Sequence, residues 1–430
     1  MKTQSNRLTF SQQFFIATML FGLFFGAGNL IFPIFLGSQA GRNVWPAIVG
    51  LLITGVGIPL LGVAAQGISR SNGLQEMAGR VSPRYSIFFT CALYLTIGPF
   101  FAIPRCASTS FTVGIEPLLG EDVNATVLLA AFSCVFFAAV LFFSLRPGKI
   151  LTWVGKLLTP LFLLVLAILV VTALLHPTDR IADVTPSAAY ATAPFFAGFL
   201  EGYNTMDALA SLAFGIVVVQ VIRDLGVEQP EAIAMTTVRS GVFSCVLMGI
   251  IYLLVTIMGV QSRGALEAAP NGGAALAQIA QHYLGRVGLL VLAATVTLAC
   301  LKTAVGLTTS CAETFAGMFP KSLSYRGWVL LFCGASFLFA NVGLTAIITY
   351  AVPVLMFLYP LAIMLILLSL LGRFFDYDRA VYRWVIGLTL PVALYDFLAA
   401  LPEGAWNALR LDGLQAVVLN YVPFAGLGLG

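Results

Sequence analysis

The sequence predicts an all-α polytopic membrane protein. Of its 430 residues, 60% are hydrophobic and only 9% are charged, and the mean hydropathy is +0.98. A soluble domain carries about 25% charged residues, so this chain has too few charges to cover a surface that faces water. Apolar runs such as 157–175 and 352–371 match the length of about 20 residues that a membrane-spanning helix requires. The short alternating segments typical of a membrane β-barrel do not stand out in the sequence.

Apolar runs bounded by Gly, Pro and charged residues predict about twelve membrane-spanning helices. Their expected ranges are 10–36, 44–67, 85–112, 125–145, 150–175, 193–222, 234–260, 287–318, 326–342, 345–371, 381–400 and 411–428. Lys and Arg are concentrated in the segments on the same side as the N-terminus, and the positive-inside rule then places both termini in the cytoplasm. The connecting segments 69–85 and 264–285 are expected to hold short helices, with a simple loop as the alternative.

The first predicted span is interrupted at FFGAGNLIFP, residues 24–33. Two glycines, an asparagine and a proline are poor residues for a helix interior. A second interruption of the same kind is GFLEGYNTMDALA, residues 198–210, in the sixth predicted span. For either segment alone, close helix packing or a kink remains the alternative explanation.

The two interruptions fall at corresponding places in two halves of five spans each. Because five is odd, the second half inserts upside down, and paired broken helices of this kind are typical of transporters built from inverted repeats. We therefore expect a single transporter domain over 1–430, with a first repeat at 10–175, a second at 193–371 and two additional helices at 381–428.

Broken helices that meet near the middle of the membrane offer groups for an amino-acid zwitterion. Half-helix N-termini present free N–H groups to a carboxylate, and unwound carbonyls present oxygen to an ammonium group or a cation. A channel would show filter loops or charged rings, which the sequence lacks. An intramembrane enzyme would require a constellation of catalytic residues, and no HExxH or GxSxG motif is present. We expect no enzyme activity, no cofactor and no nucleic-acid partner.

The eighth predicted span carries three adjacent hydroxyl groups, on Thr308, Thr309 and Ser310. Sodium is a hard cation that prefers oxygen ligands, so these hydroxyls and the carbonyls of a broken helix are suited to hold it. The alternative is that each hydroxyl bonds a carbonyl in its own helix or on a neighbouring helix.

Charged residues within predicted spans are costly and indicate function. They are Arg105, Glu201, Asp207, Lys302, Glu313 and Asp396. We expect Glu201 to structure the second interruption or to bind a cation or proton. Asp207 is expected to pair with Lys302, and the alternative for Lys302 is that its amine reaches water. Arg105 is expected near the outer end of the third span, where it would act as a gate. Glu313 is expected near the inner end of the eighth span, and Asp396 is expected to be structural.

The segments GAGNLIFP, LEGYNTMDALASLAFG and AVGLTTSCAETF resemble the bacterial branched-chain amino acid:cation symporters, the system II carriers called BrnQ. The Gly-Leu-Thr-Thr of the eighth span resembles, more distantly, symporters of the five-plus-five LeuT-type fold. The resemblance implies a sodium-coupled importer of Leu, Ile and Val that works by alternating access in the bacterial cytoplasmic (inner) membrane. The alternative is a proton-coupled symporter of the same or another neutral amino acid. The oligomeric state is not indicated.

Carried over residue by residue, the resemblance also implies ligands. The sodium ligands would be the Thr308 and Thr309 hydroxyls, the Val305 carbonyl, and carbonyls near Gly22 and Phe25. The substrate carboxylate would meet N–H groups at Gly26, Ala27 and Gly28, and the ammonium would meet carbonyls from Leu200 through Glu201 and Gly202 to Tyr203. Asn29 would serve the ion, serve the substrate or cap the second half-helix.

The pocket for the substrate side chain is expected between spans one, three, six and eight. Its candidate walls are Phe24, Tyr94, Ile97, Tyr203 and Phe214. Such a pocket separates aliphatic side chains by only about 1–3 kcal/mol per methylene, so Leu, Ile and Val should all be accepted.

Overall fold

The structure, a computed structural model, describes residues 8–26, 28–69, 71, 73–119, 124–146, 149–227, 229–266, 269–402 and 406–407. These residues form helices joined by turns, with no strand among them, which confirms the all-α prediction. Seven helical segments are long and apolar enough to cross a membrane. The last predicted span, 411–428, lies outside the described residues, and the total of twelve spans stays a prediction.

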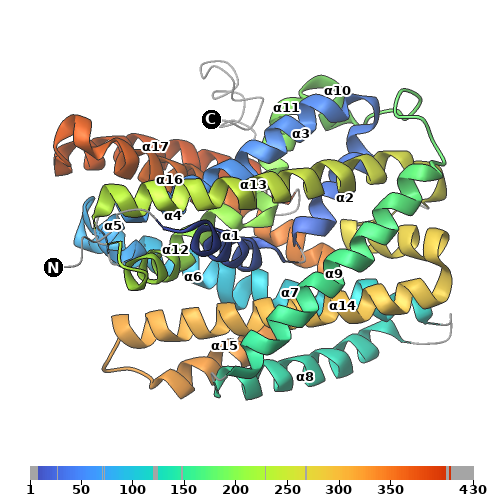
Figure 1. Cartoon of the computed structure of the whole chain (residues 1–430), viewed down its shortest axis with the longest axis horizontal. Coiled ribbons are helices and arrows are strands. Elements are labelled where there is room, and N and C mark those ends of the chain that lie inside the picture. Colours follow the sequence, from blue (N-terminus) through green and yellow to red (C-terminus); the bar gives the residue numbers. More distant parts are fainter. Residues whose placement is uncertain are drawn as a thin grey trace.

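The elements follow the expected order. They are α1 (Phe10–Phe24), α2 (Gly28–Ala40), η1 (Gly41–Asn43), α3 (Val44–Leu52), η2 (Ile53–Gly57), α4 (Ile58–Ser69), α5 (Leu74–Gly79), α6 (Pro83–Leu95), η3 (Thr96–Phe100), α7 (Ala102–Gly114), η4 (Glu116–Leu118), α8 (Ala125–Ser144), α9 (Lys149–Leu175), α10 (Ala188–Thr192), α11 (Pro194–Glu201), η5 (Gly202–Thr205), α12 (Asp207–Asp224), α13 (Pro230–Gln261), η6 (Arg263–Ala265), α14 (Gly272–Met318), α15 (Tyr325–Ala340), α16 (Leu344–Leu371), η7 (Gly372–Phe375) and α17 (Arg379–Ala399). Most of the long helices run along the longest axis of the molecule (Figure 1).

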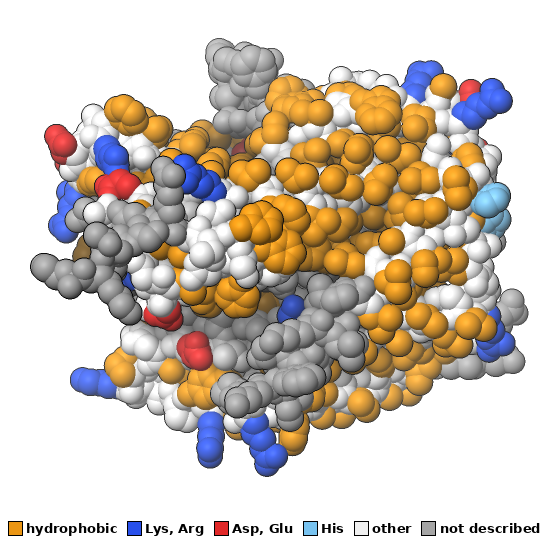
Figure 2. All heavy atoms as spheres, in the orientation of Figure 1, with side chains coloured by type: hydrophobic (Ala, Val, Ile, Leu, Met, Phe, Trp, Pro, Cys, Tyr) orange, Lys and Arg blue, Asp and Glu red, His pale blue; other side chains and the backbone are white. Residues whose placement is uncertain are grey.

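The surface has the distribution expected of a protein embedded in a bilayer. In Figure 2, hydrophobic side chains cover most of the band between the two ends of the long axis, and most charged side chains lie toward those ends. Large apolar side chains such as Phe142, Leu338 and Leu388 are exposed on this surface. A monomer in water rarely exposes an apolar surface of this extent, so it is matched to lipid.

The first predicted span is interrupted where its glycines predicted. The helix α1 starts at a capping box made by Thr9 and Gln12 and ends at Phe24. The next residue, Phe25, has extended backbone with φ −74° and ψ 103°. The second half-helix, α2, begins at Gly28. Ala27, one of the residues expected to bind the carboxylate, lies outside the described residues.

The sixth predicted span is interrupted as well. The helix α11 ends at Glu201, and a 3-10 turn, η5, follows it. Met206 then adopts a left-handed conformation with φ 62°, which turns the chain before α12 begins at Asp207. Within the turn, the Thr205 hydroxyl donates a hydrogen bond to the Gly202 carbonyl at 2.8 Å.

A third irregularity lies in the span expected at 85–112 and was not predicted as a break. The π-helical segment η3 separates α6 from α7, and Gly98 within it has non-helical dihedrals. A Cβ atom on Gly98 would lie 2.8 Å from the Cys311 sulfur of α14, so this joint packs closely against the eighth span. The kink turns α7 relative to α6 and so sets where its side chains point.

Close glycine contacts join two pairs of spans in the same way. Between α2 and α13, a Cβ on Gly37 would lie 2.1 Å from the Thr256 carbonyl oxygen. Between α11 and α3, a Cβ on Gly198 would lie 1.9 Å from the Ala47 carbonyl oxygen. Such small residues let the backbones of membrane helices approach. The first span is thus fastened to the seventh, and the sixth to the second.

Both segments expected to hold short helices do so. The segment 69–85 contains α5, and the segment 264–285 contains the first part of α14. That part ends at Gly285, whose φ of 62° and ψ of −167° change the direction of the helix before it enters the predicted eighth span.

Candidate substrate and ion site

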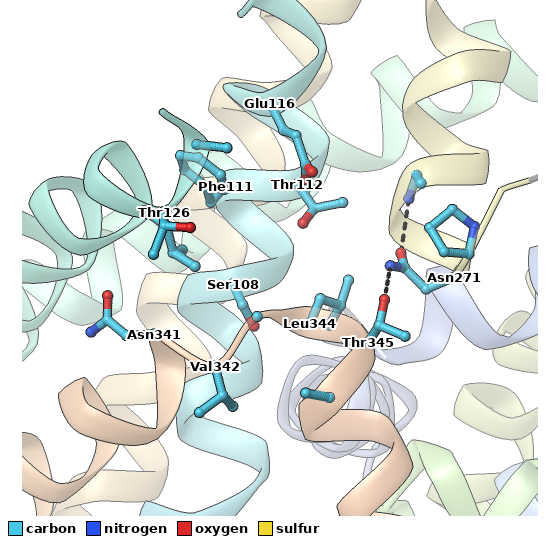
Figure 3. A pocket seen from close by; sticks show the side chains of 16 residues that line it. Ser108, Phe111, Thr112, Glu116, Thr126, Asn271, Asn341, Val342, Leu344 and Thr345 are labelled. Carbon is cyan, nitrogen blue, oxygen red and sulfur yellow. Dashed lines mark hydrogen bonds between the residues drawn. The ribbon is translucent and has the colours of Figure 1, made fainter. Parts of the chain in front are cut away.

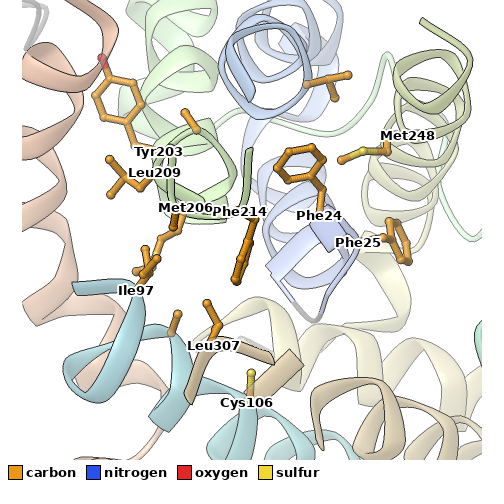
Figure 4. Close-up of a cluster of buried hydrophobic side chains, with 14 of the residues drawn as sticks. Phe24, Phe25, Ile97, Cys106, Tyr203, Met206, Leu209, Phe214, Met248 and Leu307 are labelled. Atoms are coloured by element: carbon orange, nitrogen blue, oxygen red, sulfur yellow. The ribbon is translucent and has the colours of Figure 1, made fainter. Parts of the chain in front are cut away.

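The two interruptions border one small cavity of about 50 Å³. Its lining comes from the two broken spans, from η3 and α7, and from α14. The lining residues are Phe24, Gly26, Gly28, Asn29, Ile97, Ala102, Arg105, Cys106, Thr205, Met206, Asp207, Ala210, Phe214, Thr303 and Leu307. Figure 4 shows Ile97, Met206, Phe214 and Leu307 grouped on its apolar side.

The structure brings some of the predicted substrate residues to this cavity and leaves others away from it. Phe24, Gly26, Gly28, Asn29, Ile97 and Phe214 line it. Four others do not. Tyr94 donates a hydrogen bond to the Ala213 carbonyl at 3.2 Å, and Tyr203 stacks on Tyr359 with ring centroids 4.0 Å apart. Gly202 packs against Thr54, where a Cβ atom would lie 1.9 Å from the hydroxyl oxygen.

Glu201, the remaining one of the four, stays at the interruption without lining the cavity. Its carboxylate accepts a hydrogen bond from the Asn204 side chain at 3.2 Å. The contact links the end of α11 to the 3-10 turn, and the role expected for Glu201 stays a prediction. The sixth span contributes to the cavity through Thr205, Met206 and Asp207 instead.

Asn29 ties the two interruptions together. Its Oδ1 accepts the Gly26 N–H at 2.7 Å, and its Nδ2 donates to Asp207 and to the Tyr252 hydroxyl, each at 2.5 Å. The side chain is 2% exposed, so all three bonds are shielded from water. The structure shows Asn29 as a polar link between the first, sixth and seventh spans, which was not among the three roles expected for it.

The expected ion pair between Asp207 and Lys302 is not formed. Asp207 accepts its hydrogen bonds from Asn29 and from Tyr252. The Lys302 ammonium donates to the Gly22 carbonyl, with an N–O distance of 3.4 Å. Asp207 has two neutral donors and the Lys302 ammonium has a backbone oxygen, so each group has hydrogen-bond partners other than the expected one.

Arg105 does not lie at the outer end of its span, where we expected a gate. It lines the central cavity and is 7% exposed. Its Nη1 donates to the Asn204 carbonyl at 2.6 Å and its Nη2 to the Thr205 carbonyl at 3.5 Å. The guanidinium group also lies over the Phe32 ring, 5.1 Å from the centroid. The kink at η3 places this charge against the sixth-span interruption.

The residues implied as sodium ligands lie at the C-terminal end of α1 and on α14. The Thr308 hydroxyl is buried and makes no hydrogen bond, so it has an oxygen free for a ligand. Phe25 has extended backbone, which frees its carbonyl from the regular helix. The Gly22 carbonyl, in contrast, carries the Lys302 ammonium. Thr309 is half-buried, Val305 is buried, and Glu313 is exposed, as expected for a side chain that reaches water.

A second, larger cavity of about 300 Å³ lies further along α7 (Figure 3). Ser108, Thr112 and Glu116 line it, and they follow Arg105 at intervals that keep one face of a helix. On its far side the Asn271 side chain donates to Thr345 at 2.9 Å. The polar face of α7 therefore leads from the central cavity to this second one.

Comparisons with known proteins agree with this architecture. The sequence model of the family described as branched-chain amino acid transport protein matches residues 10–430. The chain belongs to this family. Its relatives include the branched-chain amino acid permease BrnQ of Lactobacillus delbrueckii subsp. lactis, 53% identical over 99% of this chain and 94% of that protein. The branched-chain amino acid transport system 3 carrier protein of Pseudomonas aeruginosa is 43% identical over 96% and 90% of the two chains.

These relatives are permeases and carriers, so this member of the family is a transporter rather than an enzyme. Among solved structures, the inward-facing conformation of Mhp1 matches with a TM-score of 0.54 at 13% identity, over 91% of this chain and 95% of that one. The match shows a shared LeuT-type helical arrangement.

Several residues in or next to the cavity had no sequence signal that singled them out. Tyr252 is an aromatic residue in an apolar span, and only the structure shows its 3.2 Å bond to Asp207. Thr303 lies five residues before the hydroxyl cluster, with its hydroxyl 3.4 Å from a Cβ built on Gly26. Arg105 did carry a signal, because it is a charge within an apolar span.

Proposed function

We propose that this protein imports the branched-chain amino acids Leu, Ile and Val by sodium-coupled alternating access in the cytoplasmic membrane of a bacterium, with both termini in the cytoplasm. The observation that supports it most is the cavity at which both helix interruptions meet. Unwound backbone is tolerated in a membrane only where it lines such a cavity or is buried in protein. The names of the relatives supply the substrate class.

The walls of the cavity suit a branched aliphatic side chain. Phe24, Ile97, Phe214 and Leu307 contribute apolar surface to the cavity, and Arg105 and Asp207 contribute charged side chains. An apolar wall without hydrogen-bond partners distinguishes Leu from Val by only about 1–3 kcal/mol. The same site should therefore carry all three substrates.

The glycine contacts support the inverted repeat and its motion. If the second half repeats the first, the first span corresponds to the sixth and the second to the seventh. The contact of the first span with the seventh then corresponds to the contact of the sixth with the second, and both use a glycine against a backbone carbonyl. We infer that these four spans move as one unit against α7, α8, α14 and α15, with the cavity at the boundary between the two units.

The donors around the first interruption fit a sodium ion. The buried Thr308 hydroxyl has no hydrogen-bond partner, and an orphaned buried oxygen is a natural ligand for a hard cation. The ion would add a positive charge between α14 and the first span, and would hold the two moving units together.

One observation favours proton coupling as a second candidate. The Lys302 ammonium donates to the Gly22 carbonyl, which is one of the oxygens assigned to sodium. The protein's own ammonium group is thus bonded to a carbonyl that was expected to bind the coupling ion. In this case the gain and loss of a proton at Lys302 would replace sodium binding.

Uptake of labelled leucine into proteoliposomes distinguishes the candidates. We expect an inward sodium gradient to drive accumulation at equal pH on both sides, and excess Ile or Val to compete. Accumulation driven by a pH gradient in sodium-free buffer would favour the second candidate, and Lys302→Ala should then abolish it. Absence of leucine uptake under either gradient would refute the proposed function itself.

A further inference from the structure

Arg105 is a buried cation that forms no ion pair with the carboxylates of the described residues. It is 7% exposed, and two of its five N–H groups are used by the Asn204 and Thr205 carbonyls. No carboxylate of the described residues lies within ion-pair distance of it, and the ion pair found among them joins Arg373 to Glu231. A buried charge is more stable when it is paired as well as hydrogen-bonded, so the guanidinium group is suited to bind a further anion at ion-pair distance.

The start of α2 reinforces this preference. A Cβ atom on Gly28 would lie 3.1 Å from the Arg105 Nη2, so the guanidinium group stands against the first residue of the half-helix. The first N–H groups of a helix lack intrahelical partners, and the helix dipole is positive there. The guanidinium and the helix start therefore attract the same anion.

Asp207 provides the opposite charge in the same cavity. Both hydrogen bonds that its side chain accepts, from Asn29 and from Tyr252, go to Oδ2. Its second oxygen, Oδ1, is left for a further donor. A carboxylate held in this way is suited to an ammonium group, because a hydrogen bond between two charged groups is stronger than one between neutral groups.

We propose that Arg105 binds the α-carboxylate of the substrate and Asp207 binds its α-ammonium group, so that the cavity selects α-amino acids by both charges. The assignment rests on the proposed function and deepens it. It replaces the Gly26 N–H as carboxylate donor, since Asn29 Oδ1 already accepts that group. It also replaces the carbonyls of Leu200 to Tyr203 as the ammonium site, since these residues do not line the cavity.

The proposal predicts a selectivity among competing compounds that a purely structural role of Arg105 and Asp207 would not produce. Leucinol keeps the ammonium group and side chain of leucine but lacks the carboxylate, and 4-methylpentanoate lacks the ammonium group. Both should compete with labelled leucine at least about tenfold more weakly than leucine itself, because each leaves one buried charge unpaired.

The test compares these competitors in two cavity variants, Arg105→Gln and Asp207→Asn, reconstituted as full-length protein. Arg263→Gln is the matched control for the first, because Arg263 is an exposed arginine that donates to the Ser38 carbonyl at 2.7 Å away from the cavity. Asp396→Asn is the control for the second, because Asp396 is a buried carboxylate outside the cavity.

We expect Arg105→Gln to weaken the binding of leucine and of 4-methylpentanoate about tenfold or more, while the binding of leucinol changes little. We expect Asp207→Asn to weaken the binding of leucine and of leucinol, while the binding of 4-methylpentanoate changes little. The controls should keep the wild-type order. Equal weakening of all three compounds in both variants would overturn the proposal, because it would indicate a structural role.

The variant Gly28→Ala tests the same assignment while it keeps the charges of Arg105 and Asp207. The added methyl group displaces Nη2 of Arg105, so leucine should bind several-fold more weakly and leucinol should be unaffected. This variant decides the question if the charge variants do not fold, and unchanged leucine binding in it would then overturn the assignment. A wild-type protein that takes up no leucine would instead refute the proposed function.

Discussion

Replacement of Asn29 by alanine should loosen the junction of the two helix interruptions. The substitution removes an acceptor for the Gly26 N–H and a donor to both Asp207 and Tyr252. A neutral hydrogen bond contributes about 0.5–1.5 kcal/mol and one to a charged group about 1.5–3 kcal/mol. Because the site is buried, water does not readily replace these bonds, and the total loss is about 2.5–6 kcal/mol.

Asn43→Ala is the matched control, because the half-buried Asn43 side chain donates a single bond to the Tyr190 carbonyl at 2.9 Å. We expect Asn29→Ala to lower the Tm of the purified protein in detergent several times further than the control does. Leucine affinity should also fall in Asn29→Ala alone, since Asp207 loses one of its two donors. A Tm shift no larger than that of the control, with leucine affinity unchanged, would refute the reasoning.

Three further predictions test other parts of the structure. Gly198→Ala forces two backbones apart and should destabilise the protein by about 1–3 kcal/mol in thermal unfolding, whereas Gly334→Ala, with open space around it, should not; equal shifts would contradict the close packing. Thr308→Val should raise the sodium concentration for half-maximal leucine uptake about tenfold, and an unchanged sodium dependence would remove Thr308 from the ion site. Asp207→Asn and Lys302→Gln should combine additively in uptake assays, to within about 0.5 kcal/mol, because the two groups share no bond; strong coupling between them would restore the expected ion pair.

The two interruptions were predictable because they depend on residues that act locally. Glycine, asparagine and proline disfavour the interior of any helix, so the local sequence alone predicts the breaks near Gly26 and Gly202. The apolar composition likewise predicts the helical class, because it is set by the lipid solvent rather than by any tertiary contact.

The partners of the charged residues were not predictable in the same way. Opposite charge suggested Lys302 as the partner of Asp207, but the buried carboxylate is satisfied by Asn29 and Tyr252, from two other spans. Nothing in the sequence indicates which neutral donor will bond a carboxylate that is distant along the chain. Tertiary packing alone brings these groups together.

The position of Arg105 was predicted wrongly because the backbone of the third span is irregular. A regular helix through the third span would carry Arg105 toward the outer end. The non-helical dihedrals of Gly98 turn the chain just before α7, and the guanidinium then reaches the carbonyls of the sixth-span interruption. This joint packs closely against Cys311 of α14, a tertiary contact that the sequence does not reveal.

The measurement that tests the central claim most directly is an experimental structure of the protein with leucine bound. The account predicts leucine in the cavity between the two helix interruptions, with its carboxylate at Arg105, its ammonium group at Asp207 and its side chain against Phe214. Leucine bound elsewhere, with this cavity filled by side chains, would contradict the account.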